Sequence, residues 1–322
     1  MTVKVSRINI LSLALLLILM LLMSGCSSKI DTSQLSDLGG VYSYSMKDMD
    51  FDVELTGALS DGISNAKITS SSDEYAAAAL AETVYNSTIR SWGIKRKPNG
   101  QIPDADPGAP ELLEKYGGIY IGDTSKKEIY LTFDEGYENG YTSKILDVLR
   151  DNNVKAVFFI TGPYLKEHQD LVRRMVEEGH YVGNHTISHP SLPTLDNARL
   201  EEEVLGLDRV FYEKFNQHMK FLRPPKGEYS ERSLALTSKL GYCNMFWSFA
   251  YDDWYRDKIR GPEYAYNKVM ENLHNGAILL LHAVSKDNAD ALDMIIKGAR
   301  ERGYTFGDPI NLLKNTNESS ES

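Results

Sequence analysis

The chain has 322 residues, of which 42% are hydrophobic and 25% charged, so it is long enough for one large domain with a substantial core. Its 45 acidic residues outnumber its 35 basic residues, which gives a net charge of −10. This balance argues against a nucleic-acid partner, because phosphate binding requires a basic face that releases counterions.

Residues 1–25 have the pattern of a secretory signal. Lys4 and Arg7 precede an apolar run over residues 10–23, and small residues then lead to Cys26. The run is shorter than the about 18 apolar residues that indicate a spanning helix. Because Met-Ser-Gly-Cys resembles the bacterial lipobox, we expect lipidation of Cys26 and an extracytoplasmic protein anchored to the cell membrane. The alternative is an uncleaved N-terminal membrane anchor.

Cys243 is the other cysteine of the chain. If Cys26 is lipidated, no disulfide can form, so the exported domain depends on its core alone. The apolar run around Cys243 predicts a packed core thiol rather than a nucleophile.

The chain divides by composition into a tether and a catalytic body. Residues 26–91 are rich in Ser, Asp, Thr and Gly, and an Ala-rich stretch at residues 75–85 predicts one local helix. We expect the body at residues 92–315, beginning with a proline-rich lead-in, and a disordered tail at residues 316–322.

From residue 119 onward, apolar strands and amphipathic helices alternate. Strands are expected at residues 128–133, 154–160, 181–183, 221–223, 242–249, 277–281 and 304–306, and helices at residues 142–152, 164–178, 195–215, 230–240, 262–273 and 289–302. Continuous apolar strands separated by helices indicate a parallel sheet covered by helices. With about seven such units and no dinucleotide fingerprint, we expect an α/β fold, a distorted (β/α) barrel rather than a doubly wound sheet.

Polar residues stand where the predicted strands end. They are Asp134, His185, His189, Arg223, Asp253 and His282. In a barrel of parallel strands these ends share one face, where active sites are built. The pattern therefore predicts an active site.

His185 and His189 have the spacing of two metal ligands. In a helical turn, residues i and i+4 lie on one face, so both rings could reach one ion. Thr186 stands where zinc proteases have their glutamate, so the general base must come from elsewhere. A structural histidine pair is the alternative.

Asp134 and Glu135 are adjacent carboxylates before a glycine. A metal hydrolase needs one carboxylate at the metal and another that takes a proton from water. Arg223 beside Asp134 would keep that carboxylate ionised and oriented. The alternatives are solvated turn acids and a surface arginine.

Asp253 and His282 could complete the site. A histidine oriented by an aspartate is a natural general acid for a leaving amine. Trp254 could form an apolar wall for a sugar face, although a core tryptophan is equally common.

In order, these motifs resemble those of the polysaccharide deacetylase family, also called the NodB homology domain or carbohydrate esterase family 4. The matching segments are Thr132–Glu135, His185–His189, Arg223–Gly227, Asp253–Trp254 and Leu280–His282. The resemblance covers about residues 92–310. Residues 136–142 and 281–288 are most similar to the delta-lactam-biosynthetic de-N-acetylases, which deacetylate N-acetylmuramic acid in peptidoglycan.

The resemblance implies one divalent metal, zinc or another divalent ion, and a role for each matching residue. Asp134 would be the general base, steered by Arg223, and His282 the general acid, oriented by Asp253. The other implied residues are the metal ligands His185, His189 and Glu135 and the substrate-binding residues Lys226 (through its backbone N–H), Trp254 and Leu280.

Position 135 is usually Asp in the family. Because Glu is one methylene longer, Glu135 either ligates from a shifted rotamer or leaves a two-histidine site completed by water.

The function implied is metal-dependent de-N-acetylation of peptidoglycan glycan strands, at N-acetylmuramic acid residues. Two alternatives stay open. One is deacetylation of N-acetylglucosamine units or another acetylated polysaccharide such as xylan. The other is an inactive, glycan-binding lipoprotein.

Overall fold

The computed structural model describes residues 85–97 and 100–313. The predicted signal, nearly all of the predicted tether with its helix, and the predicted tail therefore lie outside the described residues. Within the described part of the chain, no helix is long and apolar enough to cross a membrane.

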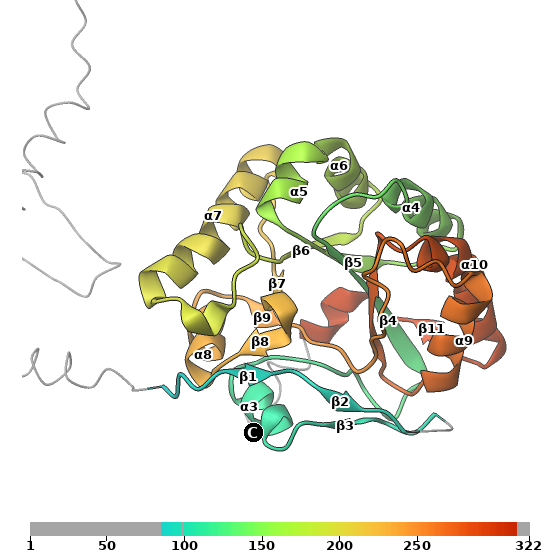
Figure 1. Ribbon diagram of the computed structural model, residues 1–322, viewed down its shortest axis with the longest axis horizontal. Coiled ribbons are helices and arrows are strands. Elements are labelled where there is room, and N and C mark those ends of the chain that lie inside the picture. The colour runs from blue at the N-terminus through green and yellow to red at the C-terminus, as the bar shows by residue number, and fades with distance from the viewer. Residues whose placement is uncertain (1–84, 98–99, 314–322) are drawn as a thin grey trace, which may run out of the picture. The chain divides into compact units, whose positions relative to one another are not determined.

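A seven-stranded parallel sheet forms the centre of the protein (Figure 1). Its order is β10-β4-β5-β6-β7-β9, and β11 pairs with β4. The strands are β4 (Glu128–Glu135), β5 (Ala156–Ile160), β6 (Tyr181–Asn184), β7 (Phe221–Leu222), β9 (Cys243–Asn244), β10 (Ile278–His282) and β11 (Thr305–Phe306). Most strand residues are apolar and buried, which is the pattern of a parallel sheet covered on both faces.

The sheet curves into a half-barrel whose two edges are linked by an irregular segment. Phe249 bridges Leu279 of β10, and Met245 bridges Ile119. The predicted strand at residues 242–249 is therefore too long, since only Cys243–Asn244 belong to a ladder. The predicted (β/α) barrel of about seven parallel strands is confirmed in this distorted form.

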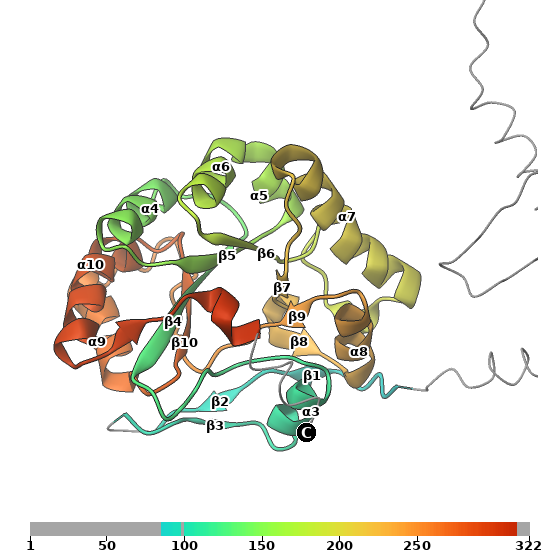
Figure 2. The ribbon, with the colours of Figure 1, turned by 180° about the vertical axis from the view of Figure 1, so that it is seen from behind.

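Helices surround the sheet (Figures 1 and 2). They are α4 (Thr142–Asp151), α5 (Gly162–Glu167), α6 (Gln169–Glu177), α7 (Asn197–Phe215), α8 (Glu231–Lys239), α9 (Pro262–Asn272) and α10 (Lys286–Glu301). The single helix predicted at residues 164–178 is wrong. His168, with φ −127° and ψ 45°, separates α5 from α6.

The chain before residue 92 already packs on the body. Strand β1 (Arg90–Ser91) pairs with β8 (Glu228–Tyr229), and β2 (Ile94–Lys95) pairs with β3 (Asp104–Ala105) ahead of α3 (Ala109–Lys115). Trp92 is buried and donates from Nε1 to the carbonyl of Trp247 at 2.9 Å. The folded body thus begins earlier than the predicted boundary.

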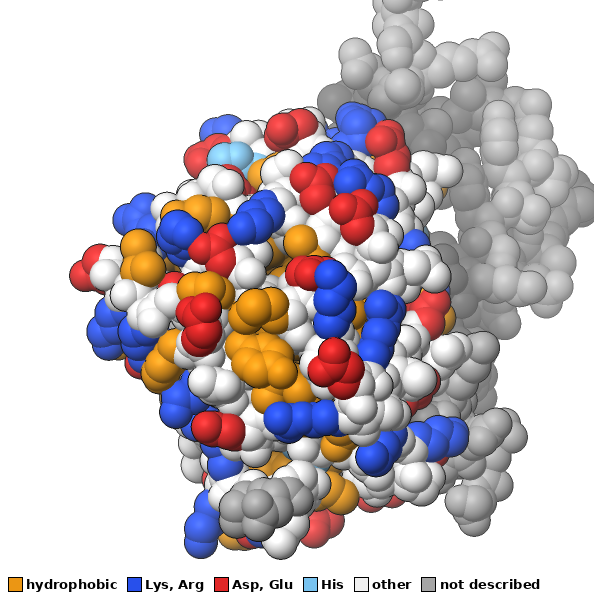
Figure 3. Space-filling view, turned by 90° about the vertical axis from the view of Figure 1, so that its right-hand side faces the viewer, with side chains coloured by type: hydrophobic (Ala, Val, Ile, Leu, Met, Phe, Trp, Pro, Cys, Tyr) orange, Lys and Arg blue, Asp and Glu red, His pale blue; other side chains and the backbone are white. Residues whose placement is uncertain are grey.

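Charged side chains of both signs cover the side that carries α9 and α10, around a small group of hydrophobic ones (Figure 3). Asp290 of α10 pairs with Lys144 and Lys286 there. Exposed ion pairs contribute little to stability. These helices are therefore held by their buried apolar faces, such as Leu292 and Ile295.

Candidate active site

A cavity of about 730 Å³ opens at the carboxyl ends of the strands. The ladder aligns these ends, since His282 is level with Asp134 and Ile160 with Asn184. The predicted residues on the cavity wall are Asp134, His185, His189, Lys226, Trp254, Leu280 and His282. The structure thus brings together side chains that lie far apart in the sequence.

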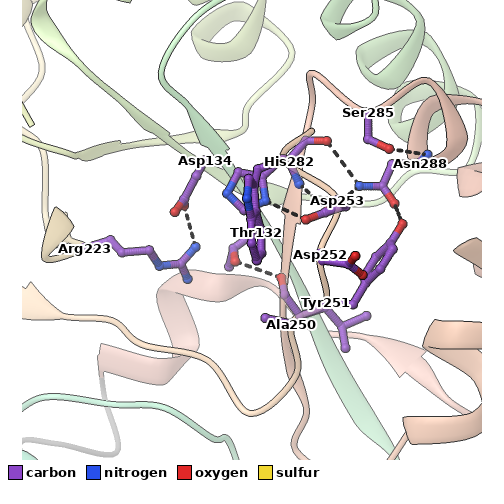
Figure 4. Close-up of polar contacts among 12 residues, drawn as sticks. Thr132, Asp134, Arg223, Ala250, Tyr251, Asp252, Asp253, His282, Ser285 and Asn288 are labelled. Carbon is purple, nitrogen blue, oxygen red and sulfur yellow. Dashed lines mark hydrogen bonds and ion pairs between the residues drawn. The ribbon is translucent and has the colours of Figure 1, made fainter. Parts of the chain in front are cut away.

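Asp134, at the end of β4, is held by Arg223 (Figure 4). Arg223 Nη1 donates to Asp134 Oδ1 at 2.7 Å. The guanidinium is fully buried, donates to the carbonyls of Met245 and Phe246, and stacks on the ring of Phe159. Arg223 therefore has one orientation, and it fixes the carboxylate.

The pKa of Asp134 is lowered below its ordinary value of 3.8. Burial alone would raise this pKa, but the charge of Arg223 and the nearby rings of His185 and His282 outweigh it. Asp134 is therefore an ionised carboxylate on the wall of a largely apolar cavity.

His185 and His189 meet at the end of β6, but no helix joins them. Thr186 (φ 68°) and His189 (φ 59°) have left-handed backbone conformations that fold the chain into a tight turn. Thr186 Oγ1 accepts a hydrogen bond from the backbone N–H of His189 at 3.0 Å. The predicted helical turn is wrong, yet both rings reach one place.

The ring of His185 is oriented so that one lone pair is available, and His189 lies beside it. His185 Nδ1 lies 2.8 Å from the carbonyl of Arg223, so it carries the hydrogen and Nε2 keeps its lone pair. Burial lowers the pKa of His185 to about 4 and also lowers that of His189. Both rings are therefore neutral near neutral pH.

This pair fits two positions of a zinc shell. The two Nε2 atoms are 3.2 Å apart. Tetrahedral ligands at about 2.0–2.1 Å from the metal lie about 3.4 Å from each other. Asp134 Oδ2 lies 3.6 Å from His185 Nε2. Within the described ranges, no group of three or more His, Cys, Asp or Glu side chains has the arrangement of a metal site.

Glu135 does not join the histidines. Its side chain is fully buried, is absent from the cavity wall, and has no hydrogen-bond partner for either carboxylate oxygen among the described residues. Burial, then the charges of Glu138 and Asp134, raise its pKa well above 4.5. In this position Glu135 is a poor candidate for a metal ligand.

Asp253 and His282 form a second fixed pair (Figure 4). His282 Nδ1 lies 2.7 Å from Asp253 Oδ1, and the backbone N–H of His282 donates to Oδ2 at 2.9 Å. Burial alone would lower the pKa of His282, but Asp253 and then Asp134 raise it above 6.5. The ring therefore tends to hold a proton, and its Nε2 is the atom left for the cavity.

Sequence reasoning assigned no role to Asn288, which contacts both members of this pair. Its place in the first turn of α10, three residues after the helix-capping Ser285, was the available signal. That signal indicates the start of a helix but does not predict a contact between Asn288 and Asp253.

The remaining predicted wall residues differ in exposure. Trp254 is 46% exposed, and its ring meets that of His282 edge-on at 5.9 Å between centroids. Leu280 is buried. Lys226 is exposed in the turn Pro225–Gly227 with φ 61°, and its ammonium pairs with no carboxylate in the described part of the chain.

Residues 121–245 match the family model described as polysaccharide deacetylase. The peptidoglycan-N-acetylmuramic acid deacetylase PdaA of Bacillus subtilis is 46% identical over 230 residues, 71% of this chain and 87% of that protein. The solved structure of B. subtilis PdaA, a family 4 carbohydrate esterase, superposes with a TM-score of 0.69 at 43% identity, covering 71% of this chain and 98% of that one.

A more distant relative is a peptidoglycan-N-acetylglucosamine deacetylase of Bacillus cereus. It is 33% identical over 198 residues, 60% of this chain and 71% of that protein.

The chain belongs to the polysaccharide deacetylase family. As a member of this family it is a hydrolase of N-acetyl amide bonds. The expected resemblance is confirmed, and the five segments that carry it converge on the one cavity.

Proposed function

We propose that this polysaccharide deacetylase removes N-acetyl groups from peptidoglycan, at N-acetylmuramic acid residues. The observation that carries the proposal is that an ionised Asp134 and a His282 that tends to hold a proton both line the same cavity. The substrate is supported by the 46% identity to a muramic acid deacetylase, against 33% to a glucosamine deacetylase.

Nε2 of His185 and Nε2 of His189 would hold a divalent metal, zinc in the first instance, with water or substrate in its other positions. When bound, the metal polarises the acetamide carbonyl and lowers the pKa of water. Asp134 accepts the proton of the attacking water, since Arg223 keeps it ionised and its Oδ2 lies 3.6 Å from His185 Nε2.

His282 donates a proton from Nε2 to the departing nitrogen as the C–N bond breaks. Its Nδ1 stays with Asp253, which stabilises the protonated ring. The balance is one water added and one amide cleaved, giving a free amine on the sugar and acetate. The backbone N–H of Lys226 is our candidate donor to the oxyanion formed on the way.

The side chain of Lys226 favours a muramic substrate. N-acetylmuramic acid differs from N-acetylglucosamine by a lactyl ether, which carries a carboxylate, on the ring carbon next to the one that bears the acetamide. Lys226 is an exposed cation on the wall without a carboxylate partner among the described residues. A charge-assisted hydrogen bond to a free lactyl carboxylate would therefore select muramic residues.

Lys226→Met tests this selection. We expect KM to rise about tenfold for strands with free lactyl carboxylates, and to stay unchanged for N-acetylglucosamine oligomers. Steady-state kinetics on both substrates provides the check. An equal effect on both would mean that Lys226 does not read the carboxylate.

The reaction itself is tested on defined glycan strands with and without peptide stems. The detergent-solubilised full chain is incubated with zinc or with a chelator, and mass spectrometry follows the loss of acetyl groups. We expect zinc-dependent loss at muramic positions, abolished in Asp134→Asn. Glycan binding without acetyl loss from any strand, chitin oligomer or acetylxylan would instead identify an inactive binding module.

We also propose that the protein is an extracytoplasmic lipoprotein, tethered to the membrane through Cys26. The support is the lipobox-like Met-Ser-Gly-Cys after the apolar run. Fatty-acid labelling of the wild type and of Cys26→Ser, followed by membrane fractionation, checks it. Equal labelling of both proteins would reject Cys26 as the anchor.

A further inference from the structure

The carboxamide of Asn288 is fully engaged beside the Asp253–His282 pair (Figure 4). Its Nδ2 donates to Asp253 Oδ2 at 2.5 Å and to the carbonyl of His282 at 3.1 Å. Its Oδ1 accepts a hydrogen bond from the hydroxyl of Tyr251. Asn288 is 1% exposed, so water does not compete for these bonds.

These bonds determine which way Asp253 points. Oδ2 of Asp253 accepts hydrogen bonds from Asn288 Nδ2 and from the backbone N–H of His282. Oδ1 is therefore left to accept from His282 Nδ1. A carboxylate held at both oxygens cannot rotate about its Cβ–Cγ bond without losing several hydrogen bonds. The plane of the imidazole, and hence the direction of Nε2, follows from that restraint.

Asp253 and the carbonyl of His282 decide the orientation of the carboxamide, because both can only accept hydrogen bonds, and Tyr251 holds its other end. A side-chain amide can be turned over, exchanging its oxygen and nitrogen. The Tyr251 hydroxyl can donate to Oδ1, and Asp253 requires a donor on the opposite side. A turned-over Asn288 would present its oxygen to a carboxylate, which is repulsive.

The neighbouring Asp287 has a different task. Its carboxylate accepts hydrogen bonds from the backbone N–H groups of Arg260 and Gly261, at 2.7 and 3.1 Å. Asp287 is buried like Asn288 and lies beside it in the first turn of α10, but its carboxylate bonds to Arg260 and Gly261 rather than to Asp253 or His282. It is therefore a matched control for damage to this turn.

We propose that Asn288 is a positioning residue for the general acid, acting through Asp253 and held at its other end by a hydrogen bond from Tyr251. The relay runs from Tyr251 through Asn288 and Asp253 to His282. As a statement about catalysis, it rests on the proposed deacetylase function.

The kinetic test uses Asn288→Asp in the full-length, zinc-loaded protein. Asp has the same shape and can still accept from Tyr251, but it replaces the donor to Asp253 by a second carboxylate oxygen. We expect kcat on peptidoglycan strands to fall about 10- to 100-fold with KM changed less than about threefold. Zinc content and the circular dichroism spectrum should match those of the wild type.

Two further variants make the result specific. Tyr251→Phe removes the hydrogen bond to Oδ1 of Asn288 but leaves the donor to Asp253 in place, so it should lower kcat by less than Asn288→Asp does. Asp287→Asn should keep kcat within about twofold of the wild type. A kcat within about twofold of wild type in Asn288→Asp, or an equal loss in Asp287→Asn, would overturn the proposal.

Proton NMR separates this proposal from the proposed function, because it needs no substrate. The wild type should give a deshielded imidazole proton from His282 Nδ1–H, absent in His282→Gln. This signal should shift or vanish in Asn288→Asp and persist in Asp287→Asn. If the wild type does not deacetylate but its NMR signals behave in this way, the relay stands and the reaction is wrong. An unchanged signal in Asn288→Asp refutes the relay whatever the activity.

Discussion

Asp134 and Glu135 are adjacent acids with opposite environments. Successive side chains of a strand point to opposite faces, so only Asp134 faces the cavity and Arg223. Glu135 is enclosed on the side of Tyr164 and Glu138, without a hydrogen bond of its own in the described structure. The pair that looks like one motif in the sequence is two separate groups.

Glu135→Gln should leave zinc affinity unchanged, whereas His185→Ala should remove most of it. Calorimetric zinc titration of the two variants gives the comparison. A clear loss of affinity in Glu135→Gln would return this residue to the metal shell, through a rotamer other than the one seen here.

The same variant should change the pH dependence of stability. The pKa of Glu135 is raised in the folded protein, so the folded state retains a proton that the unfolded state releases above pH 4.5. This proton stabilises the fold fully below that pH, and the contribution is lost as pH rises. The free energy of unfolding of Glu135→Gln, minus that of the wild type, should therefore be larger at pH 8 than at pH 5. Urea unfolding at both values measures the gain, and equal differences would contradict the raised pKa.

At the scale of elements, the turn at residues 185–189 brings the two histidine rings together, which a helical turn was expected to do. A helix cannot follow because Pro190 disfavours helical backbone before it. Left-handed residues at 186 and 189 reverse the chain instead, and Glu203 of α7 accepts from both the backbone N–H and the hydroxyl of Ser188. The histidines are thus positioned by the turn and by α7 together.

Thr186→Val should weaken zinc binding about tenfold. Valine keeps the branched shape but lacks the Oγ1 that accepts from the N–H of His189. Thr194→Val is the control, because Thr194 is exposed and its hydroxyl donates to the carbonyl of Ser191, away from the histidines. Zinc titration should separate the two, and equal affinities would mean that the turn holds without this bond.

At the scale of the molecule, the active-site face depends on closure of the half-barrel and on the N-terminal segment packed against it. Trp92 contacts the rings of Tyr229 and Phe246 and bonds to Trp247, which lines the cavity. Residues that precede the family's matched region therefore support the site.

A chain starting at residue 93 should be less stable than one starting at residue 85. It lacks β1 and the buried Trp92, and loss of a buried tryptophan side chain costs about 3–5 kcal/mol. Chemical unfolding of both chains measures the difference. Equal stability would show that β1 and Trp92 are dispensable.

Much of this protein could be predicted from local pattern. Apolar runs alternating with helical periodicity specify a parallel sheet wrapped by helices, because strands buried on both faces must be apolar throughout. Polar residues after those runs identify Asp134, His185, Arg223 and His282, because strand ends in such a sheet meet on one face. The break at His168 and the early end of β9 lack a comparable local signal.

The sequence by itself determined the kinds of groups available and their order along the chain, since residue type and strand end are local properties. Tertiary structure alone decided that Glu135 is turned away from the histidines and that Asn288 meets Asp253, 35 residues earlier in the chain. The physical reason is that direction and burial depend on neighbours from other elements. No spacing within one segment records which side of a strand the rest of the chain will cover.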